Sequence, residues 1–328
     1  MKDYAQLLDL FLKHLDVYRS GLGKKQPKEL YGPEDYILSL GGKRLRPLLA
    51  LIACDLFDKD PKLALDSALC VELFHNFSLI HDDILDAAPL RRNQPTVHVK
   101  WNTSIAILSG DVMLVKAYQA LESYGFKEYK KLTALFNKTA IEVCEGQQLD
   151  MNFENADKVT VDEYLDMITR KTAVLLGCSL QLGAINAYAG DEDQKNLYDF
   201  GKHLGIAFQL MDDLLDAFAE HPEKFGKQAG GDILANKKTF LLLKALELAS
   251  AEQKKEIYAL LESDAKQAEK KVKNMLAIFT SLDVKNLCLA EADKHTAIAI
   301  ACLNKVTAPE KKLKVLRNFA LELLNRQI

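Results

Sequence analysis

The chain has 328 residues, of which 48% are hydrophobic and 27% charged, and its formal net charge is -3 at pH 7. These values provide for a large apolar core and exclude a general electrostatic attraction to nucleic acid or to an anionic membrane surface. The six cysteines stand singly without a CxxC pair, and no apolar run approaches the roughly 20 residues that span a bilayer. We therefore expect a cytoplasmic protein with no disulfide framework, no zinc site and no stable membrane insertion.

Helices are predicted along the whole chain. Apolar residues recur at three- and four-residue spacing, and no proline stands between Pro95 and Pro222. Segments 67–86, 162–189 and 196–219 are apolar around most of their circumference, which predicts three central helices. Because no linker rich in Pro, Gly or Ser divides the chain, we expect one all-α domain over residues 1–328, a single large helical bundle.

Two copies of one acidic pattern end the first and last of these central helices. They are DDILD at Asp82–Asp86 and DDLLD at Asp212–Asp216. At about 100° per residue, the first and last Asp of each copy lie on one face of a helix. Such like-charged neighbours destabilise a helix by a few tenths of a kcal/mol, so their repetition indicates a bound cation. Carboxylate oxygens suit Mg²⁺, which completes its shell with water and substrate phosphates.

Basic residues stand close to both acidic motifs along the chain. The sequence GGKRLRP at residues 41–47 places glycines at a helix start, where backbone amides attract anions. Arg91 and Arg92 follow the first motif, and Lys227, Lys237 and Lys238 follow the second. If the central helices pack side by side, both motifs flank one central cavity, where bridging Mg²⁺ could hold a diphosphate.

The order of these motifs resembles that of the trans-isoprenyl diphosphate synthase family. The resemblance rests on GGKRLRP, on LIHDDILD followed by RR, and on QLMDDLLD followed by GK and GGDI, and it covers nearly the whole chain from residue 30 to 245. The stretch HNFSLIHDDILDAAPLRRNQPTVHVKW is most similar to short-chain geranylgeranyl and farnesyl diphosphate synthases. Asn93 and Asn236 depart from the family pattern, because glycine is usual at both positions. The second departure leaves open whether Lys237 or Lys238 is the functional lysine.

The resemblance implies a role for each matching residue. The residues implied to hold the diphosphate of isopentenyl diphosphate are Lys43, Arg46, His75 and Arg92. Those implied to bind Mg²⁺, as three ions per site with substrate present, are Asp82, Asp86, Asp212 and Asp216. Those implied to contact the allylic diphosphate are Arg91, Lys171, Lys227 and Lys237. The family positions beside the reacting carbons are matched by Lys171, Thr172 and Gln209. The family's polar floor nearby is matched by Gln147 and Asp150.

The implied activity is a head-to-tail transfer of an allylic prenyl diphosphate to isopentenyl diphosphate, carried out by a homodimer. The apolar helices expected at 105–124 and 132–149 could supply the dimer surface. Phe77 stands five residues before Asp82, about 7.5 Å lower along a helix axis, where its ring would close the pocket for the growing chain. Ser78, nearer the acids, is small. In the family this pattern implies mainly a C20 product, with C15 next.

Other classes fit the motifs less well. A class I terpene cyclase would carry an Asn/Ser/Glu metal triad in place of the second DDxxD, and a non-catalytic subunit of a heteromeric synthase would tend to lose one acidic motif. Glu72 and His75 have the ExxH spacing of a di-iron bundle, but the second ExxH that such a site needs is missing. His81 could be a metal ligand or a hydrogen-bonded residue at a helix end.

Overall fold

The computed structural model describes residues 4–218, 230–263 and 267–325. Within these ranges the chain is almost entirely helical, and the only strands are β1 (Leu90–Arg91) and β2 (Gln94–Pro95), which pair antiparallel. The predicted all-α fold class is confirmed. Contacts divide the chain into two compact units, unit 1 with Met1–Lys138, Leu175–Tyr198 and Lys305–Leu316, and unit 2 with Thr139–Val174, Asp199–Asn304 and Arg317–Ile328. The single domain over residues 1–328 stays a prediction.

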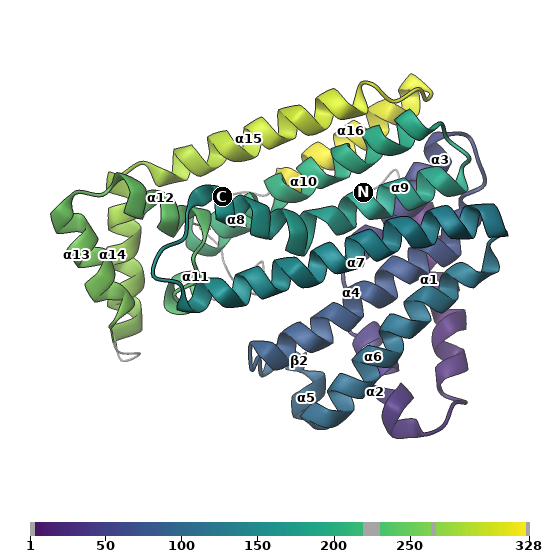
Figure 1. The fold of residues 1–328 in the computed structure, drawn as a ribbon, viewed down its shortest axis with the longest axis horizontal. Coiled ribbons are helices and arrows are strands. Elements are labelled where there is room, and N and C mark those ends of the chain that lie inside the picture. Colours follow the sequence, from purple (N-terminus) through teal and green to yellow (C-terminus); the bar gives the residue numbers. More distant parts are fainter. Residues whose placement is uncertain (1–3, 219–229, 264–266, 326–328) are drawn as a thin grey trace. The chain divides into compact units, whose positions relative to one another are not determined.

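Unit 1 is built around the buried helix α4. Its elements are α1 (Ala5–Leu22), α2 (Lys28–Ser39), α3 (Leu45–Leu56), the 3-10 turn η2 (Pro61–Ala64), α4 (Leu65–Leu85), α5 (Val97–Lys100), α6 (Thr103–Ala120) and the 3-10 turn η3 (Leu121–Ser123). Helix α4 packs against α6 and α3 (Figure 1). Every side chain from Ser67 to Phe74 is buried, which agrees with the prediction of a central helix. The first acidic motif ends this buried helix.

Unit 2 holds the second acidic motif near the end of helix α10. Its complete elements are α8 (Val161–Ile168), the π turn η4 (Thr169–Ala173), α11 (Gly231–Leu234), α12 (Phe240–Leu248), α13 (Ala251–Leu261), α14 (Ala268–Ser281) and α15 (Val284–Leu303). The boundary between the units falls within α7 (Phe126–Asn155), α9 (Val174–Asn186), α10 (Asp191–Phe218) and α16 (Glu310–Leu324). Helices α12, α14 and α15 pack on one another, and α13 lies beside α14 (Figure 1).

Capping side chains determine where several of these helices begin. The Asn102 side chain accepts a hydrogen bond from the first turn of α6. Thr160 and Glu163 form a reciprocal capping box at the start of α8, and Ser250 with Gln253 does the same for α13. The box at Thr160 fixes the first turn of α8, on which Tyr164 lies.

A π turn interrupts the segment for which the sequence predicted one continuous helix over 162–189. It spans Thr169–Ala173, between α8 and α9. Two glycines on other helices admit it: a Cβ on Gly146 would lie 2.2 Å from the backbone nitrogen of Lys171, and a Cβ on Gly205 would lie 2.6 Å from Cα of Ala173. Such single π turns are frequent at functional sites, and this one carries two of the predicted site residues.

Among the described residues, two helical segments are long and apolar enough to cross a membrane, Pro61–Leu85 and Thr103–Ser123. The expectation that no apolar run approaches this length was therefore wrong. In the first segment 67% of the apolar window is buried, as in the core helix of a soluble protein, whereas in the second only 39% is buried. Ile107, Leu108 and Val115 on α6 are exposed, the last by 66%. Helix α6 therefore presents an apolar surface that is exposed among the described residues.

Candidate active site

The first acidic motif forms the last turn of α4. The backbone N–H of Asp86 donates to the carbonyl of Asp82 at 2.8 Å, so these two residues are one helical turn apart, as predicted. Asp86 is exposed and Asp82 is half-buried. Asp83 differs from both, because it is buried and forms an ion pair with Arg91. The motif therefore combines two carboxylates on the outer face with one that supports the structure.

The hairpin that carries Arg91 explains the first departure from the family pattern. Strands β1 and β2 are joined by the two residues Arg92 and Asn93, both at positive φ, 53° and 61°. A two-residue hairpin turn of type I′ needs this conformation at both positions, and Asn adopts it more readily than most residues other than Gly. Asn93 therefore replaces the usual glycine without a change of turn.

The turn before α3 brings together four of the predicted basic residues. The Arg92 guanidinium donates to the carbonyl of Gly41 and lies against Gly42, where an added Cβ would stand 2.7 Å from it. Gly42 also has a φ of 119°, so two independent constraints require glycine there. Lys43, next in the chain, is exposed. Arg46, on the first turn of α3, reaches His75 of α4 with Nη1 to Nε2 at 3.1 Å.

The contact between Arg46 and His75 fixes the charge of both side chains. A guanidinium only donates, so Nε2 of His75 accepts and carries no proton. Burial and the neighbouring Arg46 and Arg92 lower the pKa of His75 well below its usual value. Burial also lowers the pKa of Arg46, to about 10, which leaves it charged at neutral pH. The predicted diphosphate contacts in unit 1 thus comprise cations and one neutral imidazole.

Arg44, in the middle of GGKRLRP, has a structural role that the sequence did not reveal. It is buried, and its guanidinium donates to the carboxylate of Glu72 and to the carbonyl of Leu38. Glu72 also accepts from the side-chain amide of Asn76 at 2.8 Å. Arg44 therefore joins the turn to α4 through a buried ion pair, which leaves Lys43 and Arg46 as the candidates for substrate contact.

The second acidic motif, like the first, has a buried middle Asp. Asp213 is buried, and its Oδ2 accepts a hydrogen bond of 2.5 Å from the Tyr164 hydroxyl. Burial raises the pKa of Asp213 to about 7. Asp216 is also buried, and its carboxylate accepts from the backbone N–H of Asp232 at 2.9 Å. Asp216 therefore has a structural contact with the first turn of α11 beside its predicted metal role.

The residues predicted to lie beside the reacting carbons surround the π turn. Nζ of Lys171 lies 2.6 Å from the Asp150 carboxylate, and the Thr172 hydroxyl lies 3.5 Å from Oε1 of Gln209. Oε1 of Gln147 is buried and has no hydrogen-bond partner in the described part of the chain. Unit 2 thus brings together the three predicted catalytic residues and the predicted polar floor.

The two lysines after the second motif have different environments. The ammonium group of Lys238 donates to the carbonyls of Phe153 and Ala156 at the end of α7. Lys237 is 58% exposed, and its Nζ lies 3.8 Å from the Asp232 carboxylate. Asn236, at the second departure from the family pattern, has a φ of 55°, again a conformation that Asn tolerates in place of Gly. Lys227, the other predicted lysine, lies outside the described residues.

Phe77 and His81 form part of a row of aromatic side chains on α4. The Phe77 ring is 4.7 Å from the His81 ring and 5.6 Å from that of Phe74. The small Ser78 donates to the carbonyl of His75 at 2.9 Å. His81 lies against Gly110 of α6 and makes a 3.3 Å hydrogen bond to the carbonyl of Ile107. His81 is therefore a hydrogen-bonded residue at a helix end.

The donor chemistry of both motifs fits Mg²⁺. Within the described residues, no group of three or more His, Cys, Asp or Glu side chains could hold a metal ion by itself. Each motif instead offers two carboxylates separated by one helical turn. Mg²⁺ is commonly bound by one or two carboxylates while water and substrate phosphates complete its octahedral shell.

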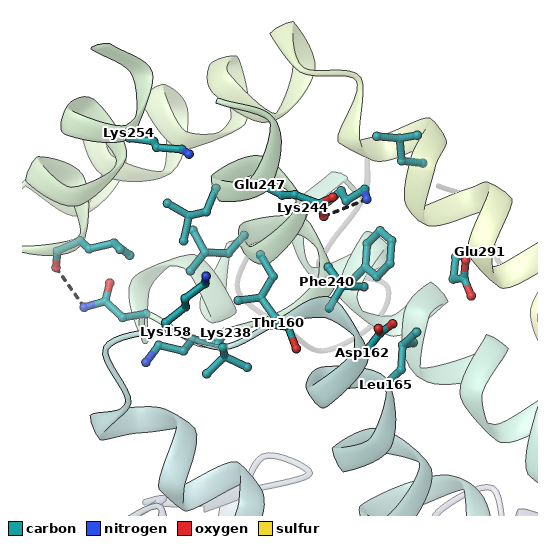
Figure 2. Close-up of a pocket in the computed structure, with 18 of the residues that line it drawn as sticks. Lys158, Thr160, Asp162, Leu165, Lys238, Phe240, Lys244, Glu247, Lys254 and Glu291 are labelled. Carbon is teal, nitrogen blue, oxygen red and sulfur yellow. Dashed lines mark hydrogen bonds and ion pairs between the residues drawn. The ribbon is translucent and has the colours of Figure 1, made fainter. Parts of the chain in front are cut away.

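A separate cavity of about 1480 Å³ lies in unit 2, between α8, α12, α13 and α15, as Figure 2 shows. Of the lysines discussed above, only Lys238 lines it. Six acidic side chains and five lysines surround it, so it offers no excess positive charge to a diphosphate. The cavity is therefore not part of the candidate active site.

Comparisons with known proteins agree with this geometry. The polyprenyl synthetase family profile matches residues 27–279. A geranylgeranyl diphosphate synthase of Sulfolobus acidocaldarius is 39% identical over 316 residues, 93% of this chain and 94% of that protein. A geranylfarnesyl diphosphate synthase of Natronomonas pharaonis is 38% identical over 263 residues, 75% of each chain. A crystal structure of a geranylgeranyl pyrophosphate synthase has 42% identity and a TM-score of 0.93, with 99% of both chains covered.

The chain therefore belongs to the polyprenyl synthetase family, and the resemblance predicted from the motifs is confirmed. It is an enzyme of the trans-prenyltransferase class.

Proposed function

We propose that the chain condenses isopentenyl diphosphate with allylic diphosphates, head to tail and in the presence of Mg²⁺, and that the main product is geranylgeranyl diphosphate. The observation that carries the proposal is the shared construction of the two acidic motifs. In each, the middle carboxylate is buried and held by a partner, Asp83 by Arg91 and Asp213 by Tyr164. This anchoring orients the helix turn that carries the first and last Asp of each motif.

The residues of unit 1 would hold isopentenyl diphosphate. Lys43, Arg46 and Arg92 supply positive charge, and Arg offers the planar donors that match a phosphate. The neutral His75 fixes the Arg46 guanidinium through the contact at 3.1 Å. A neutral imidazole adds no charge of its own, so it orients the cation without repelling it.

The residues of both motifs would hold the allylic diphosphate. When bound, Mg²⁺ supplies the positive charge that stabilises the departing diphosphate. Asp82 and Asp86 with Asp212 and Asp216 would provide the carboxylate ligands. The lysines Lys171 and Lys237, together with Arg91, would contact the same diphosphate. Arg91 is held near the first motif, because its Nε and Nη2 donate to Asp83.

The proposed reaction needs no side chain of the protein to accept the proton. The allylic C–O bond breaks and the diphosphate leaves with the electron pair. The double bond of isopentenyl diphosphate attacks the resulting carbocation, and a proton passes to the released diphosphate. Thr172 and Gln209 lie within 3.5 Å of each other at the π turn, and we infer that they border the reacting carbons.

Phe77 supports the C20 assignment. Relatives of similar identity include both a geranylgeranyl and a geranylfarnesyl synthase, so overall identity does not decide the length of the product. The Phe77 ring lies five residues before Asp82, packed between Phe74 and His81. Its fixed position suits a barrier to the growing chain, with farnesyl diphosphate as the alternative product.

We further propose a cytoplasmic homodimer. The exposed apolar side chains Ile107, Leu108 and Val115 on α6 provide a suitable interface, within the segment predicted for that role. Analytical ultracentrifugation should give twice the monomer mass, and Val115→Glu should shift the population toward the monomer.

Product analysis tests the proposed function. The purified chain would be incubated with Mg²⁺, isopentenyl diphosphate and C5, C10 or C15 allylic diphosphates. We expect a C20 product that disappears with EDTA and returns with excess Mg²⁺. Diphosphate release without isopentenyl diphosphate would indicate a cyclase instead, and a lack of elongation with every primer would contradict the proposal.

A further inference from the structure

The second acidic motif contains a buried carboxylate that the proposed reaction does not use. Asp213 lies between the motif's first and last Asp in the sequence, about 100° around α10 from Asp212. Both Asp213 and its partner Tyr164 are 3% exposed. A buried carboxylate is costly unless it is hydrogen-bonded, so the groups that bind Asp213 determine where this part of α10 can lie.

Three donors from three different elements reach this carboxylate. The Tyr164 hydroxyl, on α8, lies 2.5 Å from Oδ2, and the backbone N–H of Phe240, at the start of α12, lies 3.4 Å from the same oxygen. Nε2 of Gln209, one turn earlier on α10, lies 3.4 Å from Oδ1. The Tyr164 contact is much the shortest of the three, so it makes the largest contribution to holding Asp213.

These contacts continue to the π turn. Oε1 of Gln209 accepts from the Thr172 hydroxyl at 3.5 Å, while its Nε2 faces Asp213. The carboxylate therefore also determines which end of the Gln209 amide faces Thr172. A chain of contacts thus runs from Tyr164 through Asp213 and Gln209 to Thr172, and it ends at two residues proposed to border the reacting carbons.

A small rotation of α10 about its own axis would displace the carboxylates that it carries. Side-chain ends lie about 5 to 6 Å from a helix axis, so a rotation of about 10° moves a carboxylate by about 1 Å. A displacement of about 1 Å at a reacting site can lower a rate about 10²-fold. Asp212 and Asp216 lie on the same helix as Asp213, so whatever holds Asp213 also orients them.

We propose that Tyr164 is a positioning residue for the metal-binding face of α10. By holding Asp213, it fixes the orientation of Asp212 and Asp216 toward Mg²⁺ and the allylic diphosphate, and of Gln209 toward Thr172. The first motif uses a charged guanidinium, that of Arg91, for the equivalent task at Asp83. This inference rests on the proposed function, because it takes Asp212 and Asp216 as ligands of Mg²⁺.

Tyr164→Phe tests the inference, because it removes one hydroxyl and little volume. The control is Tyr124→Phe, which also removes a hydrogen-bonded hydroxyl: Tyr124 donates to the carbonyl of Leu63 at 2.9 Å and accepts from the N–H of Ser67 at 3.0 Å. Ser67 lies 15 residues before Asp82, about 22 Å away along α4. Tyr124→Phe therefore loses comparable hydrogen bonds at a place in unit 1 that is far from the first acidic motif.

Two measurements separate positioning from stability. Calorimetric titration of inorganic diphosphate at a series of Mg²⁺ concentrations reports ligand binding without turnover, and steady-state kinetics give kcat and each KM. We expect Tyr164→Phe to raise the Mg²⁺ concentration for half-maximal binding about tenfold or more and to lower kcat. The KM for isopentenyl diphosphate should not change. Tyr124→Phe should keep wild-type values in both measurements.

A second variant distinguishes a loss of positioning from a folding defect. Tyr164→Phe leaves a buried carboxylate without its main donor, whereas the double variant Tyr164→Phe/Asp213→Leu replaces both partners by apolar groups of similar shape. The double variant should fold and should show the same rise in the Mg²⁺ requirement. Wild-type Mg²⁺ dependence in either variant, or an equal change in Tyr124→Phe, would overturn the proposal. If the wild-type chain itself bound no Mg²⁺ and diphosphate, the proposed function would fail instead.

Discussion

Asp83 and Arg91 form a bidentate ion pair in which three hydrogen bonds of 2.8 to 3.0 Å hold a carboxylate that is only 1% exposed. The pair joins the end of α4 to strand β1. An acidic motif that would repel itself is thereby anchored by its own middle residue. The same relationship recurs at Asp213, where a tyrosine takes the place of the arginine.

Loss of this arginine should destabilise unit 1. Arg91→Gln leaves the Asp83 carboxylate buried without a cation, and removal of one partner from a buried ion pair costs about 3 kcal/mol or more. Urea unfolding, followed by circular dichroism, would measure the difference. Arg19→Gln is the control, because the pair between Arg19 and Asp35 is more exposed and should contribute less than about 1 kcal/mol. Equal losses in the two variants would show that the Asp83 pair is not structural.

The adjacent lysines Lys237 and Lys238 should differ in the kind of defect they cause. Lys237→Ala should lower kcat/KM for the allylic substrate about 10²-fold with little change in stability, because its ammonium group is exposed and lies 3.8 Å from Asp232, whose backbone N–H binds Asp216. Lys238→Met should instead lower the melting temperature, because the carbonyls of Phe153 and Ala156 lose their donor. Kinetics and thermal unfolding of both variants check this assignment. The reverse pattern would make Lys238 the functional lysine.

Shortening of Phe77 should lengthen the product. Phe77→Ala removes the ring proposed to stop chain growth, so products at least one isoprene unit longer than the wild-type product should accumulate. Liquid chromatography with mass spectrometry of the dephosphorylated products gives the distribution. Phe279→Leu, at a buried phenylalanine in unit 2, controls for general loosening of the core. An unchanged product in Phe77→Ala would place the barrier elsewhere.

The outer carboxylates should be required for turnover but not for folding. Asp82→Ala and Asp212→Ala should each lower kcat at least about 10²- to 10³-fold, which is the usual effect of losing one preorganised charge-stabilising group. Their circular dichroism spectra should match that of the wild type. Asp9→Ala, at an exposed residue of α1, is the matched control and should keep full activity. Activity of Asp82→Ala near the wild-type value would remove Asp82 from the site.

Acid should destabilise unit 2 through a pair of histidines. Nδ1 of His203 lies 2.9 Å from Nδ1 of His295, whose Nε2 lies 3.4 Å from Glu291. Burial, followed by the neighbouring His295 and Lys202, lowers the pKa of His203 to about 4, and burial also lowers that of His295. The unfolded chain therefore binds protons below about pH 6.5 that the folded chain does not bind. The contribution of these histidines to the free energy of unfolding is therefore full above that pH and decreases as the pH falls toward 4.

His203→Gln should weaken this acid sensitivity. Urea unfolding at pH 7 and pH 5 gives the change in the free energy of unfolding for wild type and variant. The variant should lose less stability between the two pH values, because it no longer carries the group whose pKa is lowered on folding. The charged neighbours Asp199, Lys202, Glu291 and Lys294 remain in both proteins. An identical loss in the two proteins would contradict the assignment to His203.

Local patterns in the sequence were sufficient to predict the helices and the two acidic motifs, whereas the other candidate residues came from the family resemblance. Apolar spacing alone identified α4 as a central helix, and the i, i+4 spacing placed Asp82 and Asp86 on one face, because both depend only on the geometry of a single helix. Asn93 and Asn236 appeared as departures from a family pattern. The structure shows that each has a positive φ, which Asn tolerates, so the backbone conformation could be kept.

Contacts between residues far apart in the sequence could be seen only in the folded chain. Tyr164 lies 49 residues from Asp213, and Lys238 lies more than 80 residues from the carbonyls that it binds. No local spacing relates such residues, so their roles could not be predicted, and neither could the structural role of Arg44. The π turn also escaped prediction, because it depends on glycines of two other helices. Helical spacing is enough to tell which carboxylates share a helix face, whereas packing between distant segments sets which carboxylate is buried and which group binds it.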